Sequence, residues 1–306
     1  MPRLALVTAI AAAALDDELV PLLDACARAG IATHIRAWDD PTVTWSRFDA
    51  VLLRSPWDYT ERLREFLDWC AHVSTRSSLI NPLPVVRWNT DKHYLAALAE
   101  RGVPVVATHF VEPDMDPLAT LQAFLAAHPQ ATEFVVKPAV GAGSRDAQRY
   151  LRSQEFAAAN HIARLLEADR SAMLQPYLAS VDRDGETALM YFQGRFSHAI
   201  RKGPLLQRDE GPTEHLFAAE EITARIPGQD ELALAGQVLA AASDSLQLQA
   251  PLTYARVDLI RDDDGRPRVL ELELCEPSLF FLHAAGSADR FAALMADTLR
   301  RSVPAS

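Results

Sequence analysis

The chain has 306 residues, 49% of them hydrophobic, which is the balance of a soluble globular protein with two or three packed domains. Its formal net charge of −11, without any run of basic residues, argues against nucleic-acid binding, which relies on clustered Lys and Arg. No apolar run approaches the roughly 20 residues that a membrane span needs, so we expect no membrane insertion.

The first 88 residues alternate strand and helix patterns, which favours a parallel sheet covered by helices. The apolar stretch 4–15 predicts a buried strand and turn rather than a signal peptide, because acidic residues follow it. A proline-rich joint then leads to another helix, for which Asn89 and Thr90 are candidate N-terminal caps. The expected strands are 3–9, 31–38 and 48–55, and the expected helices are 16–30 and 59–73.

A second unit continues the mixed pattern and then gives way to long strands joined by tight turns. We expect one hairpin to turn at Gln193 and Gly194 and another at Asp264 and Gly265. The expected strands are 103–111, 132–139, 147–151, 171–178 and the two arms of each hairpin, and the expected helices are 117–128, 153–168, 230–246 and 288–302. The fold class is therefore α/β with additional antiparallel segments.

Two kinds of residue are rare enough to be informative. The three cysteines (Cys26, Cys70 and Cys275) lie far apart without metal-type spacing, and predict buried free thiols in a reducing cytoplasm. Only three of the 30 basic residues are lysines (Lys92, Lys137 and Lys202), and a compact ammonium meets a phosphate differently from a guanidinium.

Lys137 lies in a predicted strand just before a loop that contains Gly141 and Gly143. A P-loop has its lysine after the glycines, and a dinucleotide fingerprint needs a third glycine and a following helix, so neither applies. A small loop between two strands can fold over a polyphosphate and offer it backbone N–H groups. An ordinary surface hairpin with two glycines is the alternative.

Three carboxylates are expected on neighbouring strands near the end of the chain. Glu271 and Glu273 point to the same face of one strand, and a hairpin would place Asp258 beside them. Like charges at such close range favour a divalent cation, and Mg²⁺ suits carboxylates combined with phosphates. The alternative is an acidic stripe on the surface, neutralised by nearby arginines.

These features, in this order and over nearly the whole chain, resemble the ATP-grasp superfamily, in its glutathione-synthetase-like and ribosomal-protein-glutamate-ligase-like branches. The motifs are Lys92 at a helix start, Lys137 before the glycine loop, the stretch 173–178 and the terminal carboxylates. The resemblance implies an ATP-grasp fold, with nucleotide held between the central and C-terminal sheets. The implied domains are an N-terminal parallel α/β substrate domain (1–88), a central lid domain (89–174) and a C-terminal domain with the metal site (175–306).

By the same resemblance, the site residues receive roles. The ATP-binding residues would be Lys92 and Lys137 for the phosphates, Gly141, Gly143 and Ser144 for the lid, Gln175, Tyr177 and Leu178 for adenine, and Glu186 or else Asp182 for ribose. Two Mg²⁺ ions would be bound by Asp258, Glu271 and Glu273. The transferring phosphoryl group would be neutralised by Arg201, Lys202 and Arg256. The family usually has asparagine at the position of Glu273, so we expect a steeper metal requirement here.

The segment that follows the third predicted strand is a candidate substrate site, because α/β sheets bind ligands at their carboxyl edge. Arg54 could bind a carboxylate, while other residues of the segment could enclose a small amino-acid-like ligand. The proposed substrate residues are Arg54, Ser55, Trp57, Asp58 and Tyr59. The alternative is a helix-entry turn after Pro56. His198, Arg208 and the stretch 206–215 are weaker candidates.

The resemblance implies that a substrate carboxylate is activated as an acyl phosphate, which an amine then attacks. It also implies a homodimer or homotetramer with ATP and Mg²⁺ as cofactors, and the free cysteines predict a cytoplasmic location. Two further functions stay open at this point. One is an intermolecular amino-acid or dipeptide ligase with the same site, and the other is a non-catalytic nucleotide-binding regulator.

Overall fold

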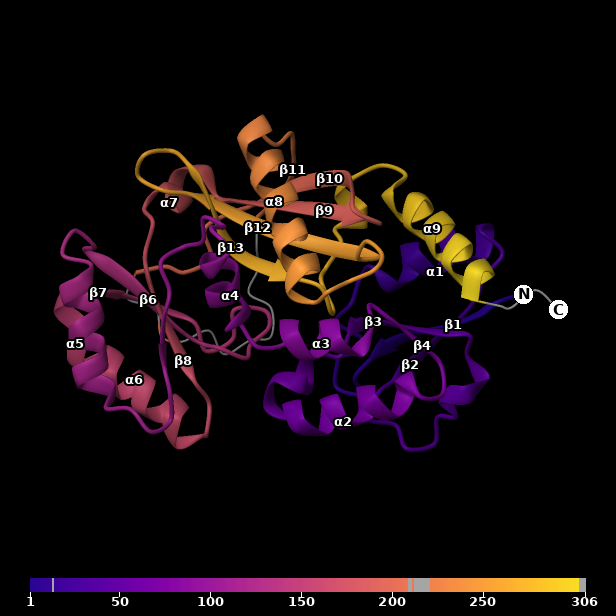
Figure 1. Ribbon diagram of the computed structural model, residues 1–306, viewed down its shortest axis with the longest axis horizontal. Helices are drawn as coiled ribbons and strands as arrows, with labels where there is room; N and C mark the ends of the chain where they lie inside the picture. Colours follow the sequence, from indigo (N-terminus) through magenta and orange to yellow (C-terminus); the bar gives the residue numbers. More distant parts are fainter. Residues whose placement is uncertain (13, 209–210, 212–220, 303–306) are drawn as a thin grey trace.

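The computed structural model describes residues 1–12, 14–208, 211 and 221–302, which form three β-sheets with helices packed around them (Figure 1). The N-terminal sheet has four parallel strands in the order β2-β1-β3-β4, which confirms the predicted parallel sheet. Its strands are β1 (Arg3–Thr8), β2 (Ala32–Ala37), β3 (Ala50–Ser55) and β4 (Ser78–Ile80). Around it lie α1 (Leu19–Arg28), α2 (Leu63–Ser74), α3 (Leu83–Asn89) and the 3₁₀ turns η1 (Trp45–Arg47) and η2 (Trp57–Glu61).

The central sheet is antiparallel, in the order β5-β8-β6-β7. It comprises β5 (His109–Val111), β6 (Glu133–Pro138), β7 (Gln148–Leu151) and β8 (Ala172–Pro176), with α5 (Pro117–Ala127), η3 (Arg152–Gln154) and α6 (Glu155–Glu167) against it. The strand expected at 103–111 is shorter than predicted. Its first half pairs elsewhere: Val106 N–H donates to Val269 O and Val269 N–H donates to Pro104 O, both at 2.9 Å.

The C-terminal sheet has the order β11-β10-β9-β12-β13. Both predicted hairpins are confirmed, and the first turns at Gln193 and Gly194, each with a positive φ, as a two-residue hairpin requires. Its strands are β9 (Glu186–Phe192), β10 (Arg195–Lys202), β11 (Ile222–Arg225), β12 (Tyr254–Arg261) and β13 (Pro267–Glu273). The accompanying helices are α4 (Tyr94–Glu100), α7 (Ser180–Asp184), α8 (Gln229–Ser245), η4 (Phe281–His283) and α9 (Ser287–Ser302).

The alternation of β9 shows how the C-terminal sheet is covered on both faces. Ala188 and Met190 pack into a core shared with α1, α9 and the N-terminal sheet, whereas Leu189 and Tyr191 face a second core with α8 and α4. In Figure 1 α9 lies beside α1, and α8 crosses the other side of the sheet. The N-terminal and C-terminal units therefore share a core, and the carboxyl end of β3 approaches the end of β13.

Asn89 attaches the α3–α4 connection to the edge strand β13. Its amide donates to Leu272 O at 2.7 Å and accepts from Leu274 N–H at 2.6 Å, so it satisfies backbone groups that the sheet leaves open. The expected helix cap at Asn89 or Thr90 is therefore wrong, since α3 ends at Asn89 and α4 begins at Tyr94. The consequence is that Lys92, in the intervening turn, lies against β13.

The prediction that Cys26, Cys70 and Cys275 are buried free thiols is confirmed. Among the described helices, none has the length and apolar character that a bilayer crossing would require. The domain limits at 88/89 and 174/175 stay a prediction.

Candidate active site

A cavity of about 250 Å³ lies between the central sheet, the C-terminal sheet and η2 of the N-terminal unit. Its walls come from β6, the glycine loop, β8, β9, β13 and η2, so segments far apart in the sequence meet there. Most of the residues selected from the sequence line it: Trp57, Tyr59, Lys92, Lys137, Gly141, Gly143, Ser144, Gln175, Tyr177, Leu178, Glu186, Lys202, Arg256, Glu271 and Glu273.

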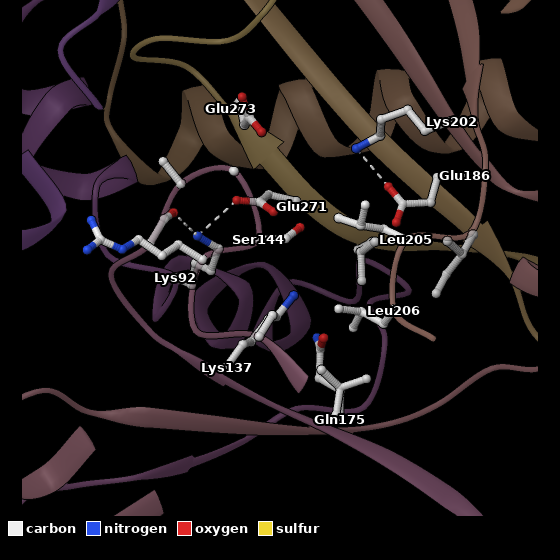
Figure 2. A pocket seen from close by; sticks show the side chains of 18 of the residues that line it. Lys92, Lys137, Ser144, Gln175, Glu186, Lys202, Leu205, Leu206, Glu271 and Glu273 are labelled. Carbon is white, nitrogen blue, oxygen red and sulfur yellow. Dashed lines mark hydrogen bonds and ion pairs between the residues drawn. The ribbon is translucent and has the colours of Figure 1, made fainter. Parts of the chain in front are cut away.

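All three lysines of the chain reach this cavity (Figure 2). The Lys92 ammonium is 2.9 Å from the Glu271 carboxylate and donates to Gly141 O at 2.7 Å. The Lys202 ammonium is 2.7 Å from Glu186. Lys137 projects from β6 toward the cavity and, within the described residues, forms no ion pair. Burial lowers the pKa of its ammonium, and the neighbouring lysines lower it further, so this position favours an anion.

The direction of side chains along β10 separates two of the predicted basic residues. Lys202 faces the cavity, and its neighbour Arg201 points to the other face, as strand periodicity requires. Arg201 donates to Asp184 O at 3.0 Å and lies 3.6 Å from Glu221. The structure therefore does not place Arg201 with the site.

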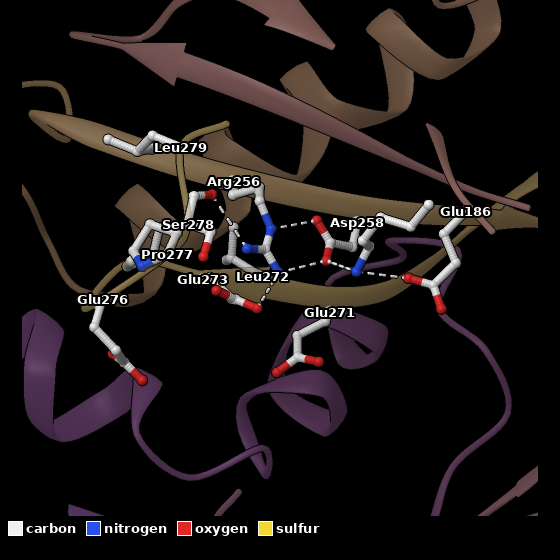
Figure 3. A network of polar contacts seen from close by, with 12 residues as sticks. Glu186, Arg256, Asp258, Glu271, Leu272, Glu273, Glu276, Pro277, Ser278 and Leu279 are labelled. Carbon is white, nitrogen blue, oxygen red and sulfur yellow. Dashed lines mark hydrogen bonds and ion pairs between the residues drawn. The ribbon is translucent and has the colours of Figure 1, made fainter. Parts of the chain in front are cut away.

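The register of β12 and β13 pairs Asp258 with Glu271 and Arg256 with Glu273. Arg256 donates to both oxygens of Asp258 at 2.8 Å and also to Glu273 (Figure 3). Asp258 is 1% exposed and is also 2.8 Å from the Lys202 ammonium. Within the described part of the chain, no group of three or more His, Cys, Asp or Glu side chains is arranged to hold a metal ion. The predicted three-carboxylate ligand set is therefore not assembled.

Two of these carboxyls, Asp258 and Glu273, differ in electrostatic environment. Burial would raise the pKa of Asp258, but Arg256 and Lys202 outweigh it and lower the pKa to about 2. At Glu273, burial and the nearby carboxylates of Glu271 and Asp258 raise the pKa to about 8 in spite of Arg256. Asp258 is thus a firmly charged partner for two basic groups, whereas burial and the acidic neighbours of Glu273 disfavour its charged form.

At the opposite end of the cavity, Gln175, Tyr177 and Leu178 form part of the wall as predicted. Of the two ribose candidates, only Glu186 lines the cavity. Asp182 instead accepts a hydrogen bond from the Tyr177 hydroxyl at 2.5 Å and pairs with Arg149 at 3.1 Å. Asp182 therefore positions Tyr177 from outside the cavity.

Only part of the candidate substrate segment lines the cavity. Trp57 and Tyr59 line the cavity, whereas Ser55 is fully buried at the end of β3. Asp58 accepts from Trp38 Nε1 at 2.8 Å and pairs with Arg62 at 3.1 Å, so it stabilises the start of α2.

Arg54 also lies outside the cavity lining. It is 1% exposed, donates to Glu18 at 3.0 Å, and donates to Pro277 O at 3.0 Å. Its guanidinium is therefore directed into the protein interior, against the loop that follows β13, and does not face a ligand.

The weaker substrate candidates also contact other protein groups. His198 Nε2 donates to Leu279 O at 2.8 Å, and Arg208 lies 2.9 Å from Glu133. Residues 209–210 and 212–215 of the stretch 206–215 lie outside the described residues.

Sequence reasoning missed the segment after β13, which contributes Glu276, Ser278 and Phe280 to the cavity wall. The Glu276 carboxylate accepts a hydrogen bond from the Tyr59 hydroxyl. A signal was present, because Glu276 comes three residues after Glu273, at the carboxyl end of a strand. It was obscured by the two more conspicuous glutamates before it.

Comparison with known proteins agrees with this architecture. Residues 4–81 match the family model described as the N-terminal domain of D-cycloserine synthetase DcsG. Cycloserine biosynthesis protein DcsG from Streptomyces lavendulae is 49% identical over 300 residues, which cover 98% of this chain and all of the relative.

Solved structures give the same result. The crystal structure of D-cycloserine synthetase DcsG has a TM-score of 0.92 and 48% identity, over 97% of this chain and 99% of the other. ATP-grasp ligase PsnB, complexed with a minimal precursor, has a TM-score of 0.61 and 17% identity, over 99% of each chain, and supports the fold alone. The chain belongs to the D-cycloserine synthetase family and is a ligase with the ATP-grasp fold.

Proposed function

We propose that this protein uses ATP to phosphorylate the carboxylate of O-ureido-D-serine and then closes the ring to D-cycloserine. ATP transfers its γ-phosphoryl group to the carboxylate, which gives ADP and an acyl phosphate. The oxygen-bound nitrogen of the ureido group attacks the acyl carbon and expels phosphate. Hydrolysis of the carbamoyl group that remains on this nitrogen consumes one water and releases carbon dioxide and ammonia. A nucleophile in the same molecule reacts with a large effective concentration, so a single bound substrate suffices.

The observation that carries this proposal is the convergence of all three lysines on one cavity. Lys137, which has no ion-pair partner among the described residues, would bind the phosphates together with Lys92. Lys92 is already oriented by Gly141 O of the glycine loop, so phosphate binding and loop position are coupled. Gln175 and Tyr177 would enclose adenine between β8 and Leu206, and Glu186 would face the ribose.

The residues present fit magnesium with two carboxylate ligands, whereas the sequence predicted three. Glu271 and Glu273 both face the cavity, and burial together with the carboxylates of Glu271 and Asp258 raises the pKa of Glu273, an effect that a bound cation would oppose. Mg²⁺ is commonly held by one or two carboxylates and by substrate phosphates, so these two glutamates would suffice. The ion would neutralise charge on the phosphoryl group during its transfer.

Arg256 would stabilise the developing negative charge of the acyl phosphate, because it lines the cavity and Asp258 fixes its guanidinium. The glycine loop would exclude water from the intermediate. Arg145 of this loop is 2.5 Å from Glu61 of the N-terminal unit. The loop thus spans the cavity from β6 to the N-terminal unit.

The test is ADP release with O-ureido-D-serine as the sole amino acid, combined with mass analysis of the product. We expect ADP and D-cycloserine in equal amounts, with ammonia. ADP release that requires a second amino acid, with a dipeptide product, would show an intermolecular ligase instead. Nucleotide binding without ADP release for any amino acid, alone or in pairs, would indicate a regulator and overturn the proposal.

A further inference from the structure

The charges around the cavity are almost completely paired. Nine charged side chains of the described residues line it, and seven of them form ion pairs. The two without an ion pair are Lys137 and Glu276. Lys137 is accounted for by the phosphates of the proposed function, but the proposed function gives Glu276 no role.

Glu276 lies on the substrate side of the cavity. It belongs to the loop between β13 and η4, and in Figure 3 its side chain points away from the Arg256 network. The Tyr59 hydroxyl donates to its carboxylate, and Trp57 Nε1 reaches its backbone carbonyl at 3.5 Å. Both aromatic residues come from η2 of the N-terminal unit, so Glu276 lies where the two units meet.

The loop that bears Glu276 is held firmly. Arg256 donates to Ser278 O at 3.2 Å, and Arg54 donates to Pro277 O at 3.0 Å. Glu18 accepts from the N–H groups of Leu279 at 2.7 Å and Phe281 at 2.6 Å. These contacts fix the backbone that directly follows Glu276, and the Glu276 side chain lines the cavity.

Glu276 is half-buried in the cavity wall, where a carboxylate without a cation is costly. Burial raises the pKa of Glu276, and the hydrogen bond from Tyr59 and the charge of Lys92 only partly oppose this. The Lys92 ammonium itself contacts Glu271 and Gly141 O. Among the described residues, no basic side chain therefore forms an ion pair with Glu276, and a positively charged group of a ligand could take that position.

We propose that Glu276 binds the primary ammonium group of the amino-acid substrate, with Tyr59 orienting the carboxylate and Trp57 beside it. This inference rests on the proposed function, whose substrate has a free α-amino group. It specifies the substrate class as amino acids with an unmodified, positively charged amine. The substrate carboxylate would then lie on the Arg256 side, where the phosphoryl group arrives.

The experiment compares the wild type with Glu276→Gln, which keeps the size of the side chain and its hydrogen bond to Tyr59. Two probes are used: O-ureido-D-serine, and the analogue in which hydrogen replaces its amino group. A hydrogen-bonded charge pair predicts that the variant raises the KM for O-ureido-D-serine about 10- to 100-fold and changes the KM for ATP less than about twofold. The analogue should give similar KM values in both proteins.

Glu65→Gln is the matched control, because Glu65 is an exposed carboxylate of α2 that pairs with Arg62 and lies outside the cavity lining. It should leave every parameter unchanged. An unchanged KM for O-ureido-D-serine in Glu276→Gln would overturn the inference. So would a loss confined to kcat, which would indicate proton transfer rather than ammonium binding.

The analogue keeps the test valid even if the variant does not fold. Wild-type protein alone should bind the analogue about 10- to 100-fold more weakly than O-ureido-D-serine, and equal affinities would overturn the inference. The proposed function fails separately, when the wild type releases no ADP with O-ureido-D-serine. Any other amino acid that the wild type turns over then replaces it as the probe, with its own deaminated analogue.

Discussion

The buried pair of Glu18 and Arg54 makes a strong prediction, because it links the N-terminal unit to the loop 277–281. Glu18→Gln is the chosen change, since glutamine has nearly the same shape but no charge. The variant would leave the Arg54 guanidinium, only 1% exposed, without a carboxylate. It would also place an amide NH₂ near the N–H groups of Leu279 and Phe281, which now donate to the two carboxylate oxygens.

Removal of one partner from a buried pair costs about 3–5 kcal/mol, so we expect the free energy of unfolding to fall by that amount. Burial raises the pKa of Glu18 even though Arg54 and the two N–H groups lower it. The carboxylate itself is thus not optimally stabilised. Most of the loss in the variant should therefore come from the unpaired charge of Arg54.

Urea denaturation measures the free energy of unfolding, and steady-state kinetics measure the KM of each substrate. The KM for the amino acid should rise more than the KM for ATP, because the loop lines the part of the cavity that we propose binds the amino acid. Asp289→Asn is the matched control: Asp289 pairs with Arg28 at 2.6 Å and also joins the two units, but both side chains are more than half exposed. It should cost at most about 1 kcal/mol. Equal destabilisation by the two variants would refute this reasoning.

Other variants test individual positions. Lys137→Met should weaken ATP binding about 10- to 100-fold in a nucleotide titration, because a charge-assisted contact to phosphate is lost; unchanged affinity would exclude that role. Glu271→Gln should abolish ADP formation while nucleotide still binds, and full turnover would remove its metal role. Burial lowers the pKa of His198 to about 4 from 6.5, so its contribution is complete above pH 6.5 and is lost as the pH falls toward 4. His198→Gln should therefore flatten the pH dependence of the unfolding free energy between pH 4 and 6.5, and an unchanged slope would contradict this.

Much of the fold could be predicted because periodicity reports burial directly. Apart from the exposed Arg3, strands β1 and β3 are buried, and each contains a continuous apolar run, as parallel strands covered on both faces do. The hairpin at Gln193 and Gly194 followed from turn chemistry. The prediction of one strand over 103–111 was wrong, because an apolar run does not reveal which strand it pairs with. Part of this stretch pairs with β13 rather than with the central sheet.

Site residues could be predicted best where the residue type itself indicates what the side chain binds. Rare lysines in an arginine-rich chain led to the cavity, because an ammonium serves a phosphate differently from a guanidinium. Asp258, Glu271 and Glu273 were correctly predicted to lie on neighbouring strands, but their basic partners were not predicted. Arg256 lies two residues before Asp258, hence on the same face of β12, and it neutralises the carboxylate that the sequence assigned to metal.

Arg54 shows why the remaining roles could not be read from the sequence. An arginine at the carboxyl end of a parallel strand is well placed either to face a ligand or to turn inward, and the choice depends on a partner distant in sequence. Here the partner is Glu18, and the two together bind the loop that follows β13. Because that loop carries Glu276 into the cavity, Arg54 still affects the substrate end, although it touches only the protein. Its substitution should therefore act on the amino-acid site through the position of the loop, which the proposed contrast between the KM values for the amino acid and ATP can detect.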